Sequence, residues 1–319
     1  MIKNAVIKYW LLALFGVAVQ VLVIIPPLLP SYIVILLTQS LIYGMVAMSL
    51  DILVGYLGLA SLGHAAYFAI GAYTTAILMT KYGTSFSVGL ITSIGMTAAI
   101  SALVGLLALR AKGVYFLLIT LAIAMSFWGL LHRWVSMTGA DNGISEIPRP
   151  QSWWVFDLYK VVDFHYFIII IFVLCFVLIY LFIRSPFGRT LVAIRDSETR
   201  MRVLGYNTWL HKYIAFIIAG TIAGLAGAFF AVFNRFVGPE EADLAQCMEI
   251  LLMVSIGGQG TLIGPNIGSF LITFLKNMLS VYTQRWLMVM ALVYIICAKY
   301  APMGIIGIMN KLQKQREGT

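Results

Sequence analysis

The stretch FIIIIFVLCFVLIYLFI, residues 167–183, contains no charged side chain and is apolar on every face of a helix. A soluble helix keeps a polar stripe for water, and a membrane β-strand alternates polar and apolar residues over about ten positions. About 20 apolar residues cross the hydrocarbon core as a helix, whose backbone groups satisfy one another. The stretch therefore predicts an all-α integral membrane protein.

The rest of the chain extends this pattern over 319 residues, of which 61% are hydrophobic and 10% charged. Apolar runs separated by proline and glycine predict a polytopic bundle of about eight to ten spans, with residues 1–319 forming one domain. The eighth run is short, so residues 243–265 form either a re-entrant segment or a span. The expected helices are 9–29, 32–50, 62–80, 86–109, 113–131, 164–183, 211–234, 243–257, 264–281 and 285–300.

The basic residues predict how the bundle is oriented. The formal net charge is +9, and most of the 21 lysines and arginines fall at residues 3–8, 110–112, 184–212 and 299–316. These positions share one side if the ten helices alternate, and loops rich in Lys and Arg stay in the cytosol. Both chain ends are thus expected to be cytosolic and loop 132–163 external. Topology accounts for the positive charge, so no nucleic-acid partner is expected.

The cytosolic loop 184–212 is the largest polar interruption on its side and contains SPFGRTLVAIRDSETRMRVLG, residues 185–205. Ser185 before Pro186 is typical of a helix start, and Gly205 suits a left-handed helix end. An amphipathic segment of this kind either binds anionic lipid headgroups or docks into a groove of a cytosolic partner. Its apolar residues are Phe187, Leu191, Ile194, Met201 and Leu204, and its charged ones are Arg189, Arg195, Asp196, Glu198, Arg200 and Arg202.

A glycine- and alanine-rich stretch, GYLGLASLGHAAYFAIGAY at 55–73, is typical of close helix packing. Its break at Ser61 and Gly63, next to His64, also suits a broken helix that exposes backbone amides to a substrate path. Both interpretations remain open from the residues alone.

Charged residues within apolar runs form a second group of pathway candidates. Glu249, like Asp51 and Lys276, would cost about 3 kcal/mol at the centre of a bilayer, so we expect it to face the bundle interior or a partner. GGQGTLIGP, which begins at Gly257 and Gly258, is either a re-entrant loop lining the path or a flexible turn.

Stretches in order along the chain resemble the LivM-type branched-chain amino acid permease family of bacterial ABC importers. In that family the cytosolic loop docks on an ATP-binding subunit, and the resemblance assigns its acidic residue and glycine to Glu198 and Gly205. Many relatives carry small residues at the positions of Arg200 and Met201, and glutamine at Leu59. The matching stretches are LVGYLGLASLGHAAYFAIGAYTTAIL (53–78), GVYFLLITLA (113–122), MTGADNGISEIPRP (137–150), AGLAGAFFA (223–231), MVSIGGQGTLIGPNIG (253–268) and YAPMGIIG (300–307).

The resemblance implies a permease subunit that moves branched-chain amino acids, or a related small solute, by alternating access. It implies as partners a second permease of LivH type, two ATP-binding subunits of LivG/LivF type and an extracytoplasmic binding protein, for which Asp141, Glu146 and Arg149 are docking candidates. These partners place the chain in the bacterial inner membrane as a multi-pass protein.

No sequence motif or cluster of reactive side chains in this chain indicates catalysis or a bound cofactor. No GxxxxGK[ST] motif occurs, and the four histidines are scattered, so ATP and Mg²⁺ are expected to be used by the partner ATPase subunits. Three alternatives stay open: a permease for urea, amides or another small solute, a self-sufficient secondary transporter with internal acid or histidine relays, and a membrane scaffold.

Overall fold

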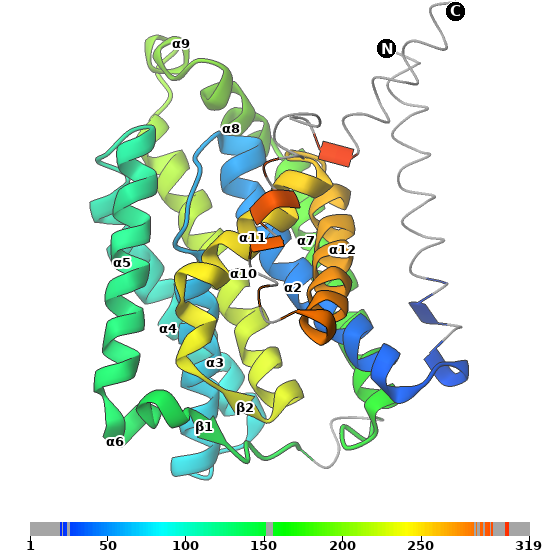
Figure 1. Cartoon of the computed structure of the whole chain (residues 1–319). Coiled ribbons are helices and arrows are strands. Elements are labelled where there is room, and N and C mark those ends of the chain that lie inside the picture. Colours follow the sequence, from blue (N-terminus) through cyan, green and yellow to red (C-terminus); the bar gives the residue numbers. More distant parts are fainter. Residues whose placement is uncertain are drawn as a thin grey trace, which may run out of the picture.

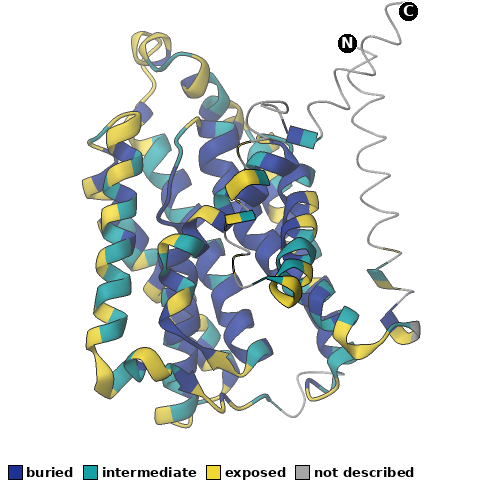
Figure 2. Cartoon of the chain, in the orientation of Figure 1, coloured by how far each residue is buried: buried dark blue, intermediate teal, exposed yellow. Residues whose placement is uncertain are grey.

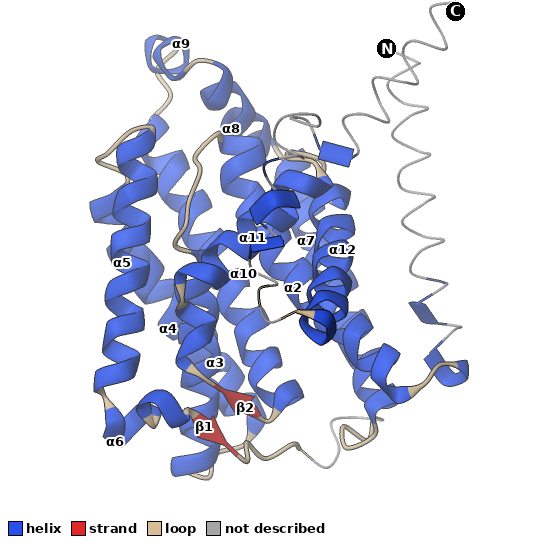
Figure 3. Ribbon diagram, viewed as in Figure 1, coloured by secondary structure: helices blue, strands red, loops and turns tan. Residues whose placement is uncertain are grey.

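The computed structural model of the chain describes residues 26–150 and 156–283, with isolated positions near both ends. Every helix expected between residues 32 and 281 is present, so the all-α bundle is confirmed over this part of the chain (Figures 1 and 3). The expected helices 9–29 and 285–300 lie largely outside the described residues.

The helices have the following bounds. The longer ones are α2 (Ser31–Asp51), α3 (His64–Lys81), α4 (Phe86–Ala108), α5 (Val114–Arg133), α7 (Val161–Arg184), α10 (Thr208–Asn234) and α12 (Ile263–Tyr282). The shorter ones are α6 (Val135–Thr138), α8 (Pro186–Asp196), α9 (Glu198–Val203) and α11 (Leu244–Gly257). Between them lie the 3₁₀ turns η1 (Pro26–Leu28), η3 (Ala140–Asn142) and η4 (Pro239–Ala242), the π-helical turn η2 (Ile52–Leu57), and the strands β1 (Ile144–Ser145) and β2 (Phe236–Val237).

Among the described residues, five segments are long and apolar enough to cross a membrane: Ser31–Tyr56, Phe86–Ala108, Val114–Arg133, Val161–Arg184 and Thr208–Asn234. The first and last of these are mostly buried and form the centre of the bundle, whereas most residues of α4 and α5 are partly or fully exposed (Figure 2). Exposed apolar faces at the periphery are what lipid contact requires.

Glycines allow α3 and α10 to pack in the centre of the bundle. A Cβ atom on Gly71 would lie 2.0 Å from the carbonyl oxygen of Gly224, and one on Gly227 would lie 1.9 Å from that of Phe68. Any larger residue at these positions would collide with backbone, so the close helix packing expected from the small residues is present here.

The loops 132–163 and 184–212 lie at opposite ends of the bundle, as their alternation predicted (Figure 1). In the first, β1 pairs antiparallel with β2, with Ile144 opposite Val237. Arg149, one of the docking candidates, donates hydrogen bonds to the carbonyl oxygens of Val232, at 3.2 Å, and Phe233. Its guanidinium also lies over aromatic rings of α7 and α10, so Arg149 anchors the loop to the bundle.

Candidate functional site

Loop 184–212, which we call the α8–α9 segment, extends beyond one end of the bundle (Figure 1). The sequence predicted one amphipathic helix here, but the structure has two, because Ser197 adopts an extended backbone and caps a new helix. Its Oγ accepts a hydrogen bond from the Arg200 amide at 3.4 Å. Ser185 caps α8 in the same way, as predicted, accepting from the Gly188 amide at 3.2 Å.

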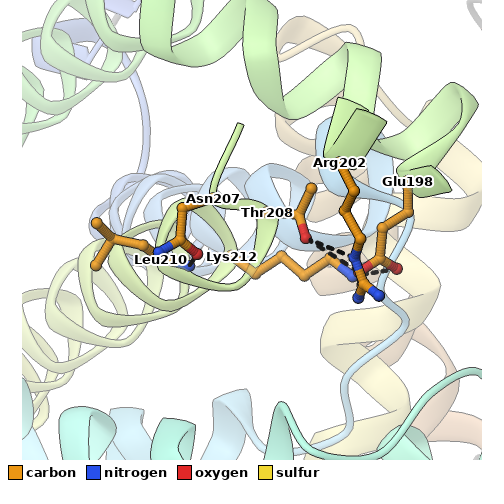
Figure 4. Close-up of polar contacts among 6 residues, drawn as sticks. All are labelled: Glu198, Arg202, Asn207, Thr208, Leu210 and Lys212. Atoms are coloured by element: carbon orange, nitrogen blue, oxygen red, sulfur yellow. Dashed lines mark hydrogen bonds and ion pairs between the residues drawn. The ribbon is translucent and has the colours of Figure 1, made fainter. Parts of the chain in front are cut away.

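Glu198 ties α9 to the start of α10. Its Oε1 contacts a guanidinium nitrogen of Arg202 at 2.5 Å and its Oε2 contacts Nζ of Lys212 at 2.7 Å. The hydroxyl of Thr208 donates to Oε1 at 3.3 Å and accepts from Nε of Arg202 at 3.2 Å (Figure 4). Nearby, Asn207 caps α10. Both carboxylate oxygens of Glu198 thus have partners within the chain, which fixes the direction of α9.

The electrostatics of Glu198 follow from these contacts. Partial burial on its own would raise the pKa of Glu198, but the hydrogen bond and charge of Lys212, followed by those of Arg202, hold that pKa below its ordinary value. The carboxylate is therefore ionised near neutral pH and keeps its two cationic partners.

The apolar face predicted for docking is covered by the chain itself. Leu191, Ile194 and Met201 are buried within the chain, and docking of this segment on a partner stays a prediction. Phe187 is also engaged within the chain, since its ring stacks on His211 with centroids 4.8 Å apart. The apolar surface that remains lies at the end of α9, where Val203 is 83% and Leu204 70% exposed. Of the candidate charged residues, Arg189, Arg195, Asp196 and Arg200 are exposed, and Gly205 has the predicted positive φ, at +85°.

Arg195 connects the α8–α9 segment to the bundle. Its guanidinium donates to the carbonyl oxygen of Gly55 in η2, and its stem covers Gly58, where a Cβ would lie 2.7 Å from Cγ of Arg195. Gly58 also has φ of +75° and ends η2, so the close approach and the turn both require glycine there.

Asp51 joins the same region from the other side of η2. Its Oδ1 accepts from the Gly260 amide at 2.7 Å, and its Oδ2 accepts from the Leu262 amide at 3.4 Å. A Cβ on Gly55 would lie 2.2 Å from the Gly260 nitrogen. Three segments therefore meet in direct contact: α8, η2 and the glycine-rich loop after α11. The buried charge of Asp51 is explained by its hydrogen bonds to these backbone amides.

The break predicted at 61–63 is present between η2 and α3. Ser61 accepts from the Gly63 amide at 3.2 Å, and the Leu62 amide donates to the Thr120 hydroxyl at 3.2 Å, which attaches the break to α5. His64 is buried, and neither of its ring nitrogens has a hydrogen-bond partner among the described residues.

Glu249, Gly257 and Gly258 belong to a second neighbourhood on and after α11. Oε2 of Glu249 lies 2.8 Å from Nζ of Lys276 on α12, so the two charges expected in apolar runs form an ion pair. Gly257 packs against backbone, because a Cβ there would lie 1.8 Å from the carbonyl oxygen of Gly264. Gly258 has φ of +121°.

The sequence did not predict Lys212, Thr208 and Gly58 as partners in these contacts. Glu198 and Lys212 are fourteen positions apart along the numbering, on different helices, so no helical spacing joins them. Gly58 carried a local signal, a glycine at the end of an apolar run, but not its contact with Arg195. Among the described residues, no group of three or more His, Cys, Asp or Glu side chains could hold a metal ion.

A bundle of apolar helices with charged residues paired in its interior, and an ordered polar segment beyond one end, defines a polytopic helical membrane protein. The pattern of the branched-chain amino acid transport system / permease component family matches residues 32–298, and the chain belongs to this family. The resemblance found in the sequence is thereby confirmed, and the protein is a membrane-spanning permease subunit of an ABC importer.

Individual relatives agree with this assignment. The chain is 29% identical to the high-affinity branched-chain amino acid transport system permease protein LivM of Escherichia coli strain K12, over 96% of this chain and 77% of that protein. It is 28% identical to LivM of Salmonella typhimurium, over 88% and 71% of the two chains. The autoinducer 2 import system permease protein LsrC of Photorhabdus laumondii is 36% identical over 30% of each chain. No solved structure matches the chain.

Proposed function

We propose that this permease carries branched-chain amino acids, or a closely related small solute, across the bacterial inner membrane. The LivM proteins, whose names give that solute class, are similar over most of this chain, whereas the autoinducer 2 permease is similar over less than a third of it. The complete importer contains a second permease subunit of LivH type, two ATP-binding subunits of LivG/LivF type and an extracytoplasmic binding protein. ATP and Mg²⁺ act in the ATP-binding subunits, and this chain contributes transport without catalysis or a cofactor of its own.

The observation that supports an ATP-driven mechanism for this permease is the α8–α9 segment. Glu198 joins α9 to α10 through Arg202 and Lys212, and Val203, Leu204 and Tyr206, at and just after the end of α9, are exposed. We assign this apolar end, together with Arg200 one turn before it on α9, as the surface that docks on an ATP-binding subunit. It belongs to the same segment as the apolar face predicted from the sequence.

The connection of Arg195 to η2 supports a mechanical role for this segment. A displacement of α8 acts on the Gly55 carbonyl through Arg195, and η2 in turn contacts the Gly260 loop. Asp51 holds that loop by two backbone amides. Rearrangement of the ATP-binding subunits therefore reaches the helices that surround the bundle interior, which is what alternating access requires.

A charge placed on the docking surface tests the proposal. We expect Val203→Asp to lower the recovery of ATP-binding subunits with the purified permease about tenfold, since a carboxylate resists burial in an apolar contact. Val135→Asp is the matched control, because Val135 is 66% exposed at the opposite end of the bundle. Full recovery of the ATP-binding subunits with Val203→Asp would contradict docking at this surface.

Orientation has its own test, since the docking surface must face the cytosol. A cysteine at Leu204 should react with an impermeant maleimide only in inside-out vesicles, and a cysteine at Ser145 only in right-side-out vesicles. The reverse pattern would contradict both the assigned topology and the docking surface.

A further inference from the structure

A group of polar side chains lies inside the bundle, where η4 and α11 pack against α2, α3 and α12. We call it the polar cluster, and its members are Tyr43, Tyr73, Glu241, Gln246, Glu249 and Lys276. Gln246 and Glu249 are each only 5% exposed, and Tyr73 is 3% exposed. Side chains of this kind are costly to bury in a membrane protein, so each needs a structural or functional reason.

The members of the polar cluster lie close to one another. Glu249 and Lys276 form the ion pair already described, at 2.8 Å. Tyr43 on α2 lies near Glu241 and Gln246, and Lys276 lies near Glu241, because α11 packs against both α2 and η4. Tyr73 on α3 lies near Glu241, because η4 packs against α3. The cluster thus joins side chains from five separate helical elements.

Several polar atoms of the cluster have no hydrogen-bond partner among the described residues. They are Oε2 of Glu241, Oε1 of Glu249, Nε2 of Gln246 and the hydroxyl of Tyr73. The buried carboxyl group of Glu249 and the half-buried one of Glu241 also lie near the same ammonium group, that of Lys276. A buried polar atom without a partner costs about 1–3 kcal/mol, so this arrangement is unfavourable unless a ligand or a proton completes it.

The position of the cluster suits a transported solute. Tyr43 lies near the midpoint of the span Ser31–Tyr56, and α11 lies at about the middle height of the bundle beside α2 and α12 (Figure 1). With 14 residues, α11 is shorter than a full span. Transporters place their solute sites near mid-membrane, beside helices that do not cross completely.

The chemistry of the cluster favours a cationic group. The start of α11 does not attract a solute anion, because the carboxylate of Asp243 already accepts from the first amide of the helix, that of Leu244, at 2.6 Å. The unpartnered carboxylate oxygens and the Tyr73 hydroxyl are hydrogen-bond acceptors, as the three donors of a primary ammonium group require. The free donor of Gln246 fits an oxygen attached to the neighbouring carbon.

We propose that Glu241 and Glu249 bind the protonated amine of the transported solute half-way across the membrane. Tyr73 and Gln246 complete the site, and Lys276 holds Glu249 in place. This inference rests on the proposed function as the permease of an importer for amino acids, and it assigns the part of such a solute that the membrane interior recognises.

The test uses the whole importer in vesicles, with its second permease, ATP-binding subunits and binding protein, and radiolabelled L-leucine as the probe. The quantity measured is the amount of leucine imported per ATP hydrolysed. We expect Glu241→Gln and Glu249→Gln to lower this ratio about tenfold or more, because each removes a charge that binds the ammonium group. Glu240→Gln, a change in the exposed neighbouring acid, should leave the ratio unchanged.

The outcomes separate this site from its alternatives. Glu241→Gln resembles a protonated glutamate, so a wild-type ratio in that variant would show that a proton satisfies the cluster and would overturn the proposal. If Glu249→Gln does not assemble, the double variant Glu249→Gln with Lys276→Gln removes the ion pair as a unit, and a wild-type ratio there would also overturn it. A wild-type importer that hydrolyses ATP but imports no leucine would contradict the proposed solute class, and with it this inference.

Discussion

The α8–α9 segment and the polar cluster are both rich in charged residues, but they differ in how many of their carboxylate oxygens have a partner within the chain. Both carboxylate oxygens of Glu198 have partners from the chain. Glu249 has a partner on Oε2 only, and Oε1 has none among the described residues. A polar network whose groups all have hydrogen-bond partners is rigid and can transmit movement. A buried network with unpartnered groups needs a ligand or a proton to complete it. We therefore propose that the permease separates the part that docks on the ATP-binding subunits from the part that binds the solute.

The largest effect is expected when the ion pair inside the bundle is broken. Lys276→Met leaves Glu249 without its cation in a buried position, which should destabilise the permease by about 3 kcal/mol. Thermal unfolding in detergent measures this loss. Lys212→Met is the matched variant in the α8–α9 segment, and it should cost about 1 kcal/mol, because Glu198 keeps Arg202 and is partly exposed. Equal losses in the two variants would remove the distinction between the regions.

The second-largest effect is expected at Arg195, which connects the α8–α9 segment to the bundle. Arg195→Met removes the hydrogen bond to Gly55, so we expect the ATP-binding subunits to assemble normally while solute uptake per ATP falls about fivefold or more. Arg195→Lys, which keeps a donor of similar reach, should restore part of the uptake. A loss of ATP-binding subunits in Arg195→Met, with no change in uptake per ATP, would place Arg195 on the docking surface instead.

A smaller effect is expected at the end of α9. Gly205 has φ of +85°, and a Cβ there would meet nothing within 4 Å, so a substitution costs only backbone strain. Gly205→Val should weaken binding of the ATP-binding subunits by about 1 kcal/mol, since a β-branched residue resists positive φ. Gly205→Asn, which tolerates this conformation, should bind nearly as wild type. Identical binding of the two variants would show that the turn does not direct α9.

The smallest effect is expected from the charge of Glu198. Because its pKa is lowered in the folded protein, its ion pairs stabilise α9 above the pKa of the unfolded chain and are lost as the pH falls through the lowered value. Glu198→Gln should weaken binding of the ATP-binding subunits about twofold at neutral pH, as a partly exposed pair does. Binding measured against pH should fall in acid for the wild type and change less in the variant. Parallel pH curves would exclude a role for this carboxylate.

Structural features that depend on residues close together in the sequence were predicted correctly. Apolar runs predicted the helices between 32 and 281, Ser185 predicted the start of α8, and Gly205 predicted a left-handed turn. These features follow from local hydrophobicity, capping and backbone preference, which need no knowledge of the fold.

Contacts between distant segments could not be predicted in the same way. The pattern of Leu191 and Ile194 indicated a buried face, but not that the chain itself covers it. Asp51 and Gly260 are 209 positions apart, and no spacing in the sequence joins them. Glu241 follows proline in PEEA, which has the composition of an exposed turn, and only packing of η4 against α3 shows that it is near the bundle interior.

The two regions are compared most directly by measuring ATP hydrolysis and leucine uptake together in vesicles that hold the whole importer. We expect Val203→Asp, on the docking surface, to lower binding-protein-stimulated hydrolysis and uptake in the same proportion. We expect Glu249→Gln, in the polar cluster, to lower uptake while most of the stimulated hydrolysis remains. If Glu249→Gln lowers hydrolysis as much as it lowers uptake, as is expected of Val203→Asp, the separation of ATPase docking from solute binding is contradicted.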